Sequence, residues 1–136
     1  MDFELDHLGI AVESLAKGKE FYEALGLGPM TTELVASEKV QVGFFNLENN
    51  ARIELLEATD SSSPIAKFLE KRGPGIHHIC LRVKDIKSIL AMLKGKGVQL
   101  INDEPRPGAH GCMVAFIHPK STGGILIELS QLGEHG

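Results

Sequence analysis

Cysteine is scarce in this sequence, and the arrangement of the two that are present excludes several kinds of site. Cys80 and Cys112 are the only cysteines among 136 residues, and they lie too far apart to form a C-x-x-C metal or redox motif. We therefore expect both to be small buried side chains in a protein of the reducing cytoplasm.

Long apolar runs and excess basic charge are also missing. No stretch approaches the roughly 20 apolar residues of a membrane helix, and the acidic start of the chain, Met1-Asp2-Phe3-Glu4, is unlike a signal peptide. The net charge is −4, so no overall positive field would attract nucleic acid. We expect neither a membrane nor a nucleic acid as a partner.

The composition is that of an ordinary folded domain. Hydrophobic residues make up 43% of the chain, which is enough for a core. Charged residues make up 24%, a globular rather than a disordered balance. The length suits one domain, and we predict that residues 1–136 form it.

An internal repeat organises this domain. Residues 5–28 align with residues 76–99 so that His7 falls on His78, and the offset of 71 also carries Phe45 onto Phe116. With three extra residues in the last turn of the second copy, Glu54 falls on Glu128, an offset of 74. A register shared through a helix and several strands indicates a duplication.

Each copy shows the pattern of one strand, one helix and three further strands. The fold class predicted is α+β, with two tandem βαβββ modules at about residues 3–59 and 75–131. The expected strands are 5–12, 30–36, 39–47 and 51–58, then 77–83, 98–103, 112–118 and 124–130. A linker helix at about 63–73 is expected to begin at Ser63-Pro64 and to end at Gly73-Pro74-Gly75.

The two module helices are expected to bury apolar stripes at helical spacing, and each is followed by a glycine suited to end it, Gly26 or Gly97. The stripe residues are Leu15, Phe21, Tyr22 and Leu25 in the first helix, and Ile86, Ile89, Leu90 and Leu93 in the second.

The repeat also duplicates chemistry. A duplicated unit brings equivalent positions close to a pseudo-two-fold axis, so one His and one Glu from each copy can converge there. The residues are His7, Glu54, His78 and Glu128. Two imidazoles and two carboxylates suit a divalent Co, Ni, Mn, Fe or Zn ion in an open site rather than a closed, thiolate-rich zinc site. Because both Glu residues lie within apolar strand segments, each needs a partner if it is buried.

The other histidines fit this site less well. His77 precedes His78 on the same strand and therefore points to the opposite face. His110 and His118 belong to loops of the second half, where an exposed histidine is the simpler interpretation. Lys67, Lys71 and Arg72 on the linker helix read as a solvated face, although a phosphate tail could use them.

Several segments taken together resemble the methylmalonyl-CoA epimerases of the vicinal oxygen chelate superfamily. They cover nearly the whole chain: residues 7–12 (HLGIAV), 53–57 (IELLE), 63–69 (SPIAKFL), 75–80 (GIHHIC), 118–121 (HPKS) and 124–129 (GILIEL). The resemblance implies that the two modules form a curved mixed sheet around a metal-binding cleft. It also implies His7, Glu54, His78 and Glu128 as ligands, the same four residues that the repeat selects.

The resemblance implies an activity as well. It is the epimerisation of (R)- and (S)-methylmalonyl-CoA, a CoA thioester, by α-proton abstraction through a metal-stabilised enolate. One divalent metal is expected per chain, Co²⁺ first, with Zn²⁺, Mn²⁺, Ni²⁺ or Mg²⁺ as alternatives. A homodimer is the family habit.

The same resemblance assigns roles to individual residues. Glu128 corresponds to one proposed base, and Lys120 and Ser121 correspond to residues near the substrate. The base of the opposite face is, in some members, a Glu at the position of Val42 here, so Glu38, a metal-bound water or another group would have to replace it. The first-module ligand is a carboxamide in some members and is Glu54 here, which changes the charge of the ligand set.

Other functions in the superfamily remain open from the sequence. A glyoxalase I-like lyase would use the same metal site, and an extradiol dioxygenase normally has two His and one carboxylate. A non-catalytic small-molecule-binding protein, as in bleomycin resistance, typically lacks the full ligand set.

Overall fold

The structure, a computed structural model, describes residues 3–133. The chain divides into two units: one is His7–His77, and the other joins the chain up to Asp6 with the chain from His78 onward. None of the helices in the described part of the chain is long and apolar enough to cross a membrane.

The first module has the predicted βαβββ order. Its elements are β1 (Glu4–Ala11), α1 (Leu15–Leu25), β2 (Thr31–Val35), β3 (Val40–Asn46) and β4 (Arg52–Ala58). The strands are hydrogen-bonded in the order β2-β3-β4-β1, with β1 parallel to β4 and the other pairs antiparallel. This order places the first and last strands of the module side by side.

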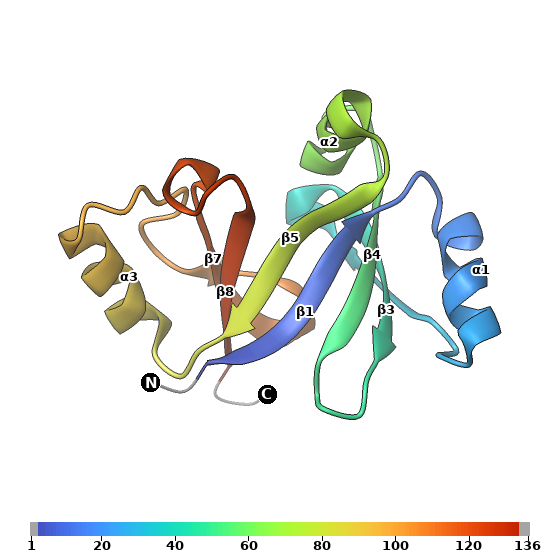
Figure 1. The fold of residues 1–136 in the computed structure, drawn as a ribbon, viewed down its shortest axis with the longest axis horizontal. Coiled ribbons are helices and arrows are strands. Elements are labelled where there is room, and N and C mark those ends of the chain that lie inside the picture. The colour runs from blue at the N-terminus through green and yellow to red at the C-terminus, as the bar shows by residue number, and fades with distance from the viewer. Residues whose placement is uncertain (1–2, 134–136) are drawn as a thin grey trace. The chain divides into compact units, whose positions relative to one another are not determined.

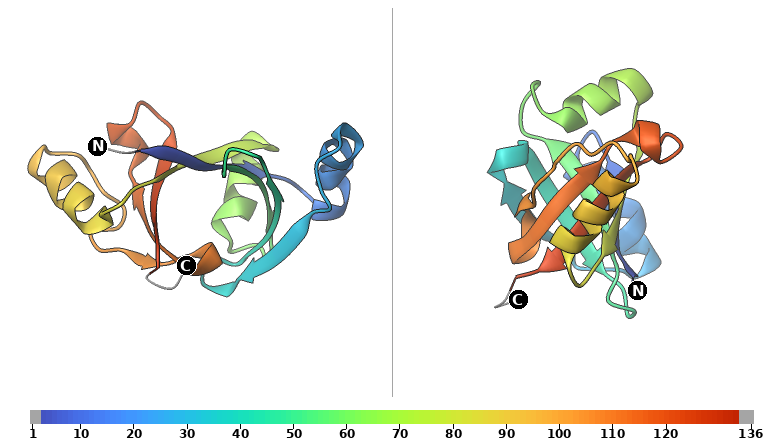
Figure 2. Two further views of the ribbon diagram at one scale, coloured as in Figure 1. Left: turned by 90° about the horizontal axis from the view of Figure 1, so that it is seen from below. Right: turned by 90° about the vertical axis from the view of Figure 1, so that its left-hand side faces the viewer.

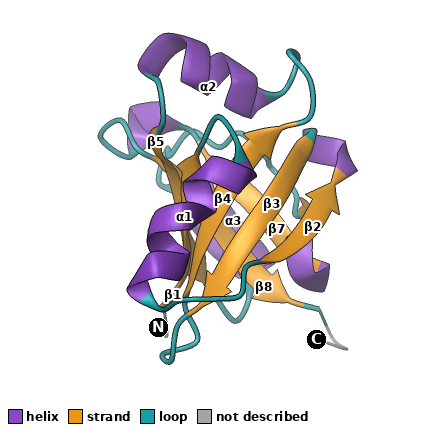
Figure 3. Cartoon of the chain, turned by 90° about the vertical axis from the view of Figure 1, so that its right-hand side faces the viewer, coloured by secondary structure: helices purple, strands orange, loops and turns teal. Residues whose placement is uncertain are grey.

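Helices cover both faces of this four-stranded part. Helix α1 lies over one face (Figure 3), where Leu15 packs with Phe45 and Leu55. Helix α2 (Pro64–Arg72) follows β4 (Figure 1), and its Ile65 packs with Val42 on the other face. Ser63 caps α2 through a hydrogen bond that its Oγ accepts from the Ile65 N–H, as the Ser-Pro pair predicted.

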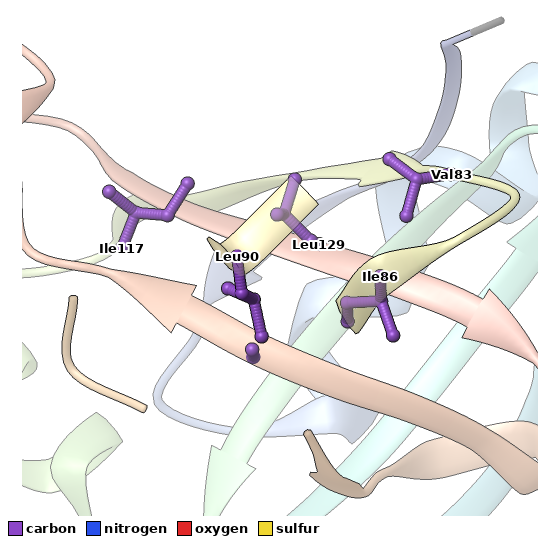
Figure 4. Close-up of a cluster of buried hydrophobic side chains, with 6 residues drawn as sticks. Val83, Ile86, Leu90, Ile117 and Leu129 are labelled. Carbon is purple, nitrogen blue, oxygen red and sulfur yellow. The ribbon is translucent and has the colours of Figure 1, made fainter. Parts of the chain in front are cut away.

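The second module repeats the plan. Its elements are β5 (Gly75–Arg82), α3 (Ile86–Gly95), β6 (Arg106–Pro107), β7 (Cys112–Ile117) and β8 (Leu126–Leu132), with the strands in the order β5-β8-β7-β6. Helix α3 covers one face of β7 and β8 (Figure 2). Ile86 and Leu90 of this helix pack there with Val83, Ile117 and Leu129 (Figure 4). The α+β class and the two βαβββ modules are therefore confirmed.

The strand registers show where the copies differ in length. β1 and β5 lie 71 residues apart at both ends, and β4 and β8 lie 74 apart. In β3, however, Phe44 pairs with Glu54, whereas in β7 Phe116 pairs with Glu128. Phe44, not Phe45, is therefore the counterpart of Phe116. One extra residue precedes β7 and only two lie in the last turn, so the predicted placement of all three in that turn was wrong.

The predicted strand 98–103 does not form. In that segment Leu100 makes only an isolated bridge to Ile117, and the strand that pairs with β7 is the short β6 at Arg106–Pro107. The Asn102 side chain explains the break, since its Oδ1 accepts the Phe116 N–H at 2.8 Å. A side-chain oxygen therefore takes a donor that a backbone carbonyl would take in a regular ladder.

The predicted apolar stripe of α1 is half wrong. Leu15 is buried, and the Tyr22 ring lies 5.4 Å from the Phe45 ring, but Phe21 and Leu25 are each 64% exposed. The helix contacts the sheet through Gly18, where a Cβ would lie 3.2 Å from Val12 and 3.4 Å from Leu55. A hydrophobic pattern cannot reveal a contact face centred on a residue without a side chain.

Candidate metal centre

The first module buries one His–Glu pair. His7 lies on β1 and Glu54 on the neighbouring parallel strand β4. His7 Nδ1 is 3.4 Å from Glu54 Oε2, and the two residues are only 6% and 3% exposed. Gly9 is the register partner of Glu54, so no side chain on β1 competes for the space beside the carboxylate.

The second module buries the equivalent pair. His78 Nε2 on β5 lies 3.1 Å from Glu128 Oε1 on β8, with exposed fractions of 6% and 8%. The small, fully buried Cys80 takes the place of Gly9 as the register partner of the carboxylate. The His78 ring also meets the ring of Phe116 edge-on, at 6.0 Å between centroids. Each module therefore presents one imidazole and one carboxylate in the same strand register.

The donor chemistry fits a divalent cation. Burying a carboxylate is costly unless a hydrogen-bond donor or a cation satisfies it. Among the described residues, the buried polar side chains are Asp6, His7, Glu54, Ser63, His78, Glu128 and Ser130, so the four predicted ligands form the majority. Imidazole nitrogens and carboxylate oxygens are ligands that cobalt, zinc, nickel and manganese share.

The other histidines lie elsewhere, as far as the structure describes them. The ring of His77 packs edge-on against Phe68 of α2, at 5.1 Å between centroids, which agrees with its pointing away from the ligand face. His118 Nδ1 accepts the Lys120 N–H at 3.0 Å and so holds a loop. His110 is only partly exposed, and its Nε2 is buried, so the expectation of an exposed loop histidine was wrong for it.

The two residues expected near the substrate belong to the loop before β8. Lys120 is exposed. The Ser121 Oγ accepts the Gln99 N–H at 2.9 Å, which ties this loop to the segment after α3. Ser121 therefore has a structural role whatever else it contacts.

The position of the opposite-face base is apolar and buried. Val42 is 3% exposed and packs with Leu56 and Ile65. Glu33 of β2 is its direct cross-strand partner and therefore lies on the same sheet face. Glu38 lies further on, in a short 3₁₀ turn after β2. The sequence alone does not reveal Glu33, because the pairing register of β2 and β3 cannot be read from it.

Two arginines next to the predicted ligands were also missed. Arg52 Nε donates to Glu54 Oε2 at 3.1 Å. In the second unit, Arg82 donates to Asp6 through Nε at 3.0 Å and Nη2 at 2.8 Å, and Asp6 is 3% exposed. Arg52 could have been predicted from strand alternation, because residues two apart on a strand lie on the same face and Arg52 is two residues before Glu54 on β4.

This fold and these pairs are those of a known class. The sequence profile of the glyoxalase/bleomycin resistance protein/dioxygenase superfamily matches residues 6–116, and the chain belongs to this superfamily. Mouse mitochondrial methylmalonyl-CoA epimerase is 42% identical over 93% of this chain and 72% of its own length. The ethylmalonyl-CoA/methylmalonyl-CoA epimerase of Cereibacter sphaeroides is 41% identical over 94% of this chain and 97% of its own.

A solved structure supports the same assignment. A Streptomyces coelicolor methylmalonyl-CoA epimerase variant in complex with 2-nitronate-propionyl-CoA has a TM-score of 0.89 and 34% identity, covering 96% of this chain and 95% of that one. The chain belongs to the methylmalonyl-CoA epimerase family of isomerases.

Proposed function

We propose that this protein interconverts (R)- and (S)-methylmalonyl-CoA by removing the proton α to the thioester carbonyl and returning it on the other face. The observation that carries the proposal is the pair of buried His–Glu contacts in matching registers, His7–Glu54 and His78–Glu128, in a member of this family. Buried, duplicated titratable groups mark a functional site more specifically than the fold does.

We further propose that these four residues hold one divalent cation, Co²⁺ first, with Zn²⁺, Mn²⁺, Ni²⁺ and Mg²⁺ as alternatives. The strand registers support this proposal, since each pair uses the first and last strands of its module. When bound, such a cation supplies Lewis-acid stabilisation of the negative charge that develops on the thioester oxygen.

Glu128 is the proposed base on one face of the substrate. Its Oε1 lies 3.1 Å from His78 Nε2, so the imidazole lies directly beside the carboxylate. Its register partner on β7 is Phe116 and on β5 is Cys80, so neither neighbouring strand places a second charged side chain in register with it.

Glu33 is the proposed proton carrier on the other face. It lies opposite Val42, at the position where some family members carry a base, and β2 places it on the same sheet face as Glu54. Glu38 is the weaker candidate because the 3₁₀ turn that contains it interrupts strand alternation.

The surroundings of the site complete the proposal. We propose that Lys120, exposed on the loop before β8, contacts the CoA thioester and that Ser121 shapes this loop. A homodimer is the expected assembly. The two free, buried cysteines support a cytoplasmic location.

The test is exchange of the α-proton of methylmalonyl-CoA in deuterated water, followed by NMR, with Co²⁺-loaded and chelator-stripped protein. We expect metal-dependent exchange that His78→Ala abolishes and that His77→Ala, the matched neighbour on the opposite face, retains. Absence of exchange by fully loaded protein contradicts the epimerase proposal. Turnover of methylglyoxal with glutathione by the same sample would instead indicate a glyoxalase I-like lyase.

A further inference from the structure

Arg52 and Glu54 form an ion pair inside the first module that the second module does not repeat. Their side chains are 15% and 4% exposed, and Arg52 Nε lies 3.1 Å from Glu54 Oε2. The same oxygen lies 3.4 Å from His7 Nδ1. One carboxylate oxygen therefore faces both an imidazole and a guanidinium.

The duplication makes the asymmetry plain. His7 pairs in register with Arg52 on β4, and His78 pairs in register with Leu126 on β8. Leu126 therefore takes the place of Arg52, so the second module has an apolar side chain where the first has a guanidinium beside Glu54. The two copies share a His and a Glu, but only the first adds a permanent positive charge two residues before the Glu.

The charge has a direct consequence for a bound cation. Two carboxylates and two neutral imidazoles carry a formal charge of −2. A divalent ion carries +2, so these four ligands and the ion together would be neutral. With the guanidinium in contact, the combined set carries −1, so the loaded site stays net positive. Charges this close and this little exposed are weakly screened by salt.

A net positive site favours the reaction proposed above. A malonyl-type thioester brings one carboxylate, and removal of its α-proton adds a second negative charge. A site without excess positive charge would gain less electrostatic stabilisation of both. The guanidinium also holds Glu54 by a charge-assisted hydrogen bond, which fixes the carboxylate before any ligand arrives.

We propose that Arg52 is a positioning residue that offsets the charge of Glu54, and so sets a preference for acyl-CoA ligands with a free carboxylate. This inference rests on the proposed function, because it requires the His–Glu pairs to hold a divalent cation. It predicts opposite effects on two ligands when Arg52 loses its charge: the metal binds more tightly and the anionic thioester binds less selectively.

The experiment compares Arg52→Met, Arg52→Lys, Glu54→Gln and the double variant Arg52→Met/Glu54→Gln with wild type. Lys17→Met, which removes an exposed cation from α1, is the matched control. Calorimetry gives the Kd for Co²⁺, and then, on loaded protein, the Kd for malonyl-CoA and for propionyl-CoA, which lacks the carboxylate. Circular dichroism checks folding, and Arg52→Gln replaces Arg52→Met if the latter does not fold.

For Arg52→Met we expect about tenfold tighter Co²⁺ binding and about a tenfold loss in the preference for malonyl-CoA over propionyl-CoA. Arg52→Lys keeps most of the preference, and the double variant restores it because both charges are removed together. Unchanged Co²⁺ affinity and preference in Arg52→Met, with wild type loading normally, overturns this inference alone. Wild-type protein that binds no Co²⁺ overturns the proposed metal site and this inference with it.

Discussion

The Glu57 carboxylate accepts a hydrogen bond from the backbone N–H of Leu15 at 2.7 Å, so the last strand of the first module caps its helix. The second module repeats the contact, since Gln131 Oε1 accepts the Ile86 N–H at 2.8 Å. These residues stand at the same offsets as the ligand pairs. The duplication therefore preserved a helix cap and a candidate ligand pair together.

This symmetry predicts equal costs in the two modules. The first N–H groups of a helix have no partner within the helix, so Glu57→Ala and Gln131→Ala should each lower the free energy of unfolding by about 1 kcal/mol. Urea denaturation measures both values, and the exposed Glu48→Ala is the control. A loss in only one module would contradict equivalent caps.

The two carboxylates of the candidate metal centre should respond differently to neutralisation. Glu128→Gln keeps a side-chain oxygen but removes the proposed base, so we expect α-proton exchange to fall by about 10² or more while Co²⁺ still binds. Glu54→Gln changes only ligand charge and should keep exchange within about tenfold of wild type. NMR exchange rates and metal content check both variants, and equal losses would argue against Glu128 as the base.

The repeat made most of these residues predictable. His7, Glu54, His78 and Glu128 were selected because the same residue types recur at fixed offsets, and the structure pairs them within each module. Their elements were also predictable, because strand and helix periods repeat twice. Each His–Glu contact lies within one module, and it follows from the first and last strands of that module being neighbours in the sheet.

The features that could not be predicted are the exact strand registers and a side chain that takes the place of a backbone hydrogen-bond partner. The Phe44–Glu54 and Phe116–Glu128 pairs differ from the aligned pattern by one residue, a shift that hydrophobic alternation does not reveal. The segment around Asn102 has the composition of a strand, yet a side-chain amide interrupts its ladder. The contact of Arg52 with Glu54 is not encoded by the repeat, because the equivalent position in the second module is Leu126.

Glu33 gives a prediction about the direction of proton transfer. With two bases, each removes the α-proton of one epimer. In Glu33→Gln, exchange of the epimer served by Glu128 should continue, while interconversion slows by about 10². Chiral analysis of the product alongside deuterium content separates the two processes. Glu38→Gln is the control, and the same split in Glu38→Gln but not in Glu33→Gln would move the assignment to Glu38.

Asp85 gives a prediction about pH. Hydrogen bonds from the Ser88 hydroxyl and the Ser88 N–H hold the pKa of the Asp85 carboxyl below its ordinary value of 3.8 at the start of α3. Because the pKa of Asp85 is lower in the folded state, the charged carboxylate stabilises the fold at pH values above the unfolded-state pKa. This stabilisation is lost as the pH falls through the folded-state pKa. Asp85→Asn keeps a cap that does not titrate.

Thermal melts of wild type and Asp85→Asn should therefore diverge with pH. We expect wild type to be the more stable at about pH 6, and the advantage to shrink as the pH falls below the ordinary Asp pKa of 3.8 toward the lower folded-state pKa. Both proteins share every other titrating group, so their difference isolates Asp85. An advantage that stays constant over this range would mean that the charge of the cap contributes nothing.

Gly43 in the first module and Gly95 in the second give a pair of glycine substitutions with opposite expected effects on stability. A Cβ at Gly43, on β3, would overlap the Met30 sulfur and lie 3.2 Å from Leu15 Cδ2, whereas one at Gly95 in α3 meets nothing within 4 Å. We expect Gly43→Ala to cost about 1–3 kcal/mol through overpacking. Gly95→Ala should add up to about 1 kcal/mol because alanine favours a helix. Chemical denaturation measures both, and Gly43→Ala as stable as wild type would show that Met30 and Leu15 repack freely around α1.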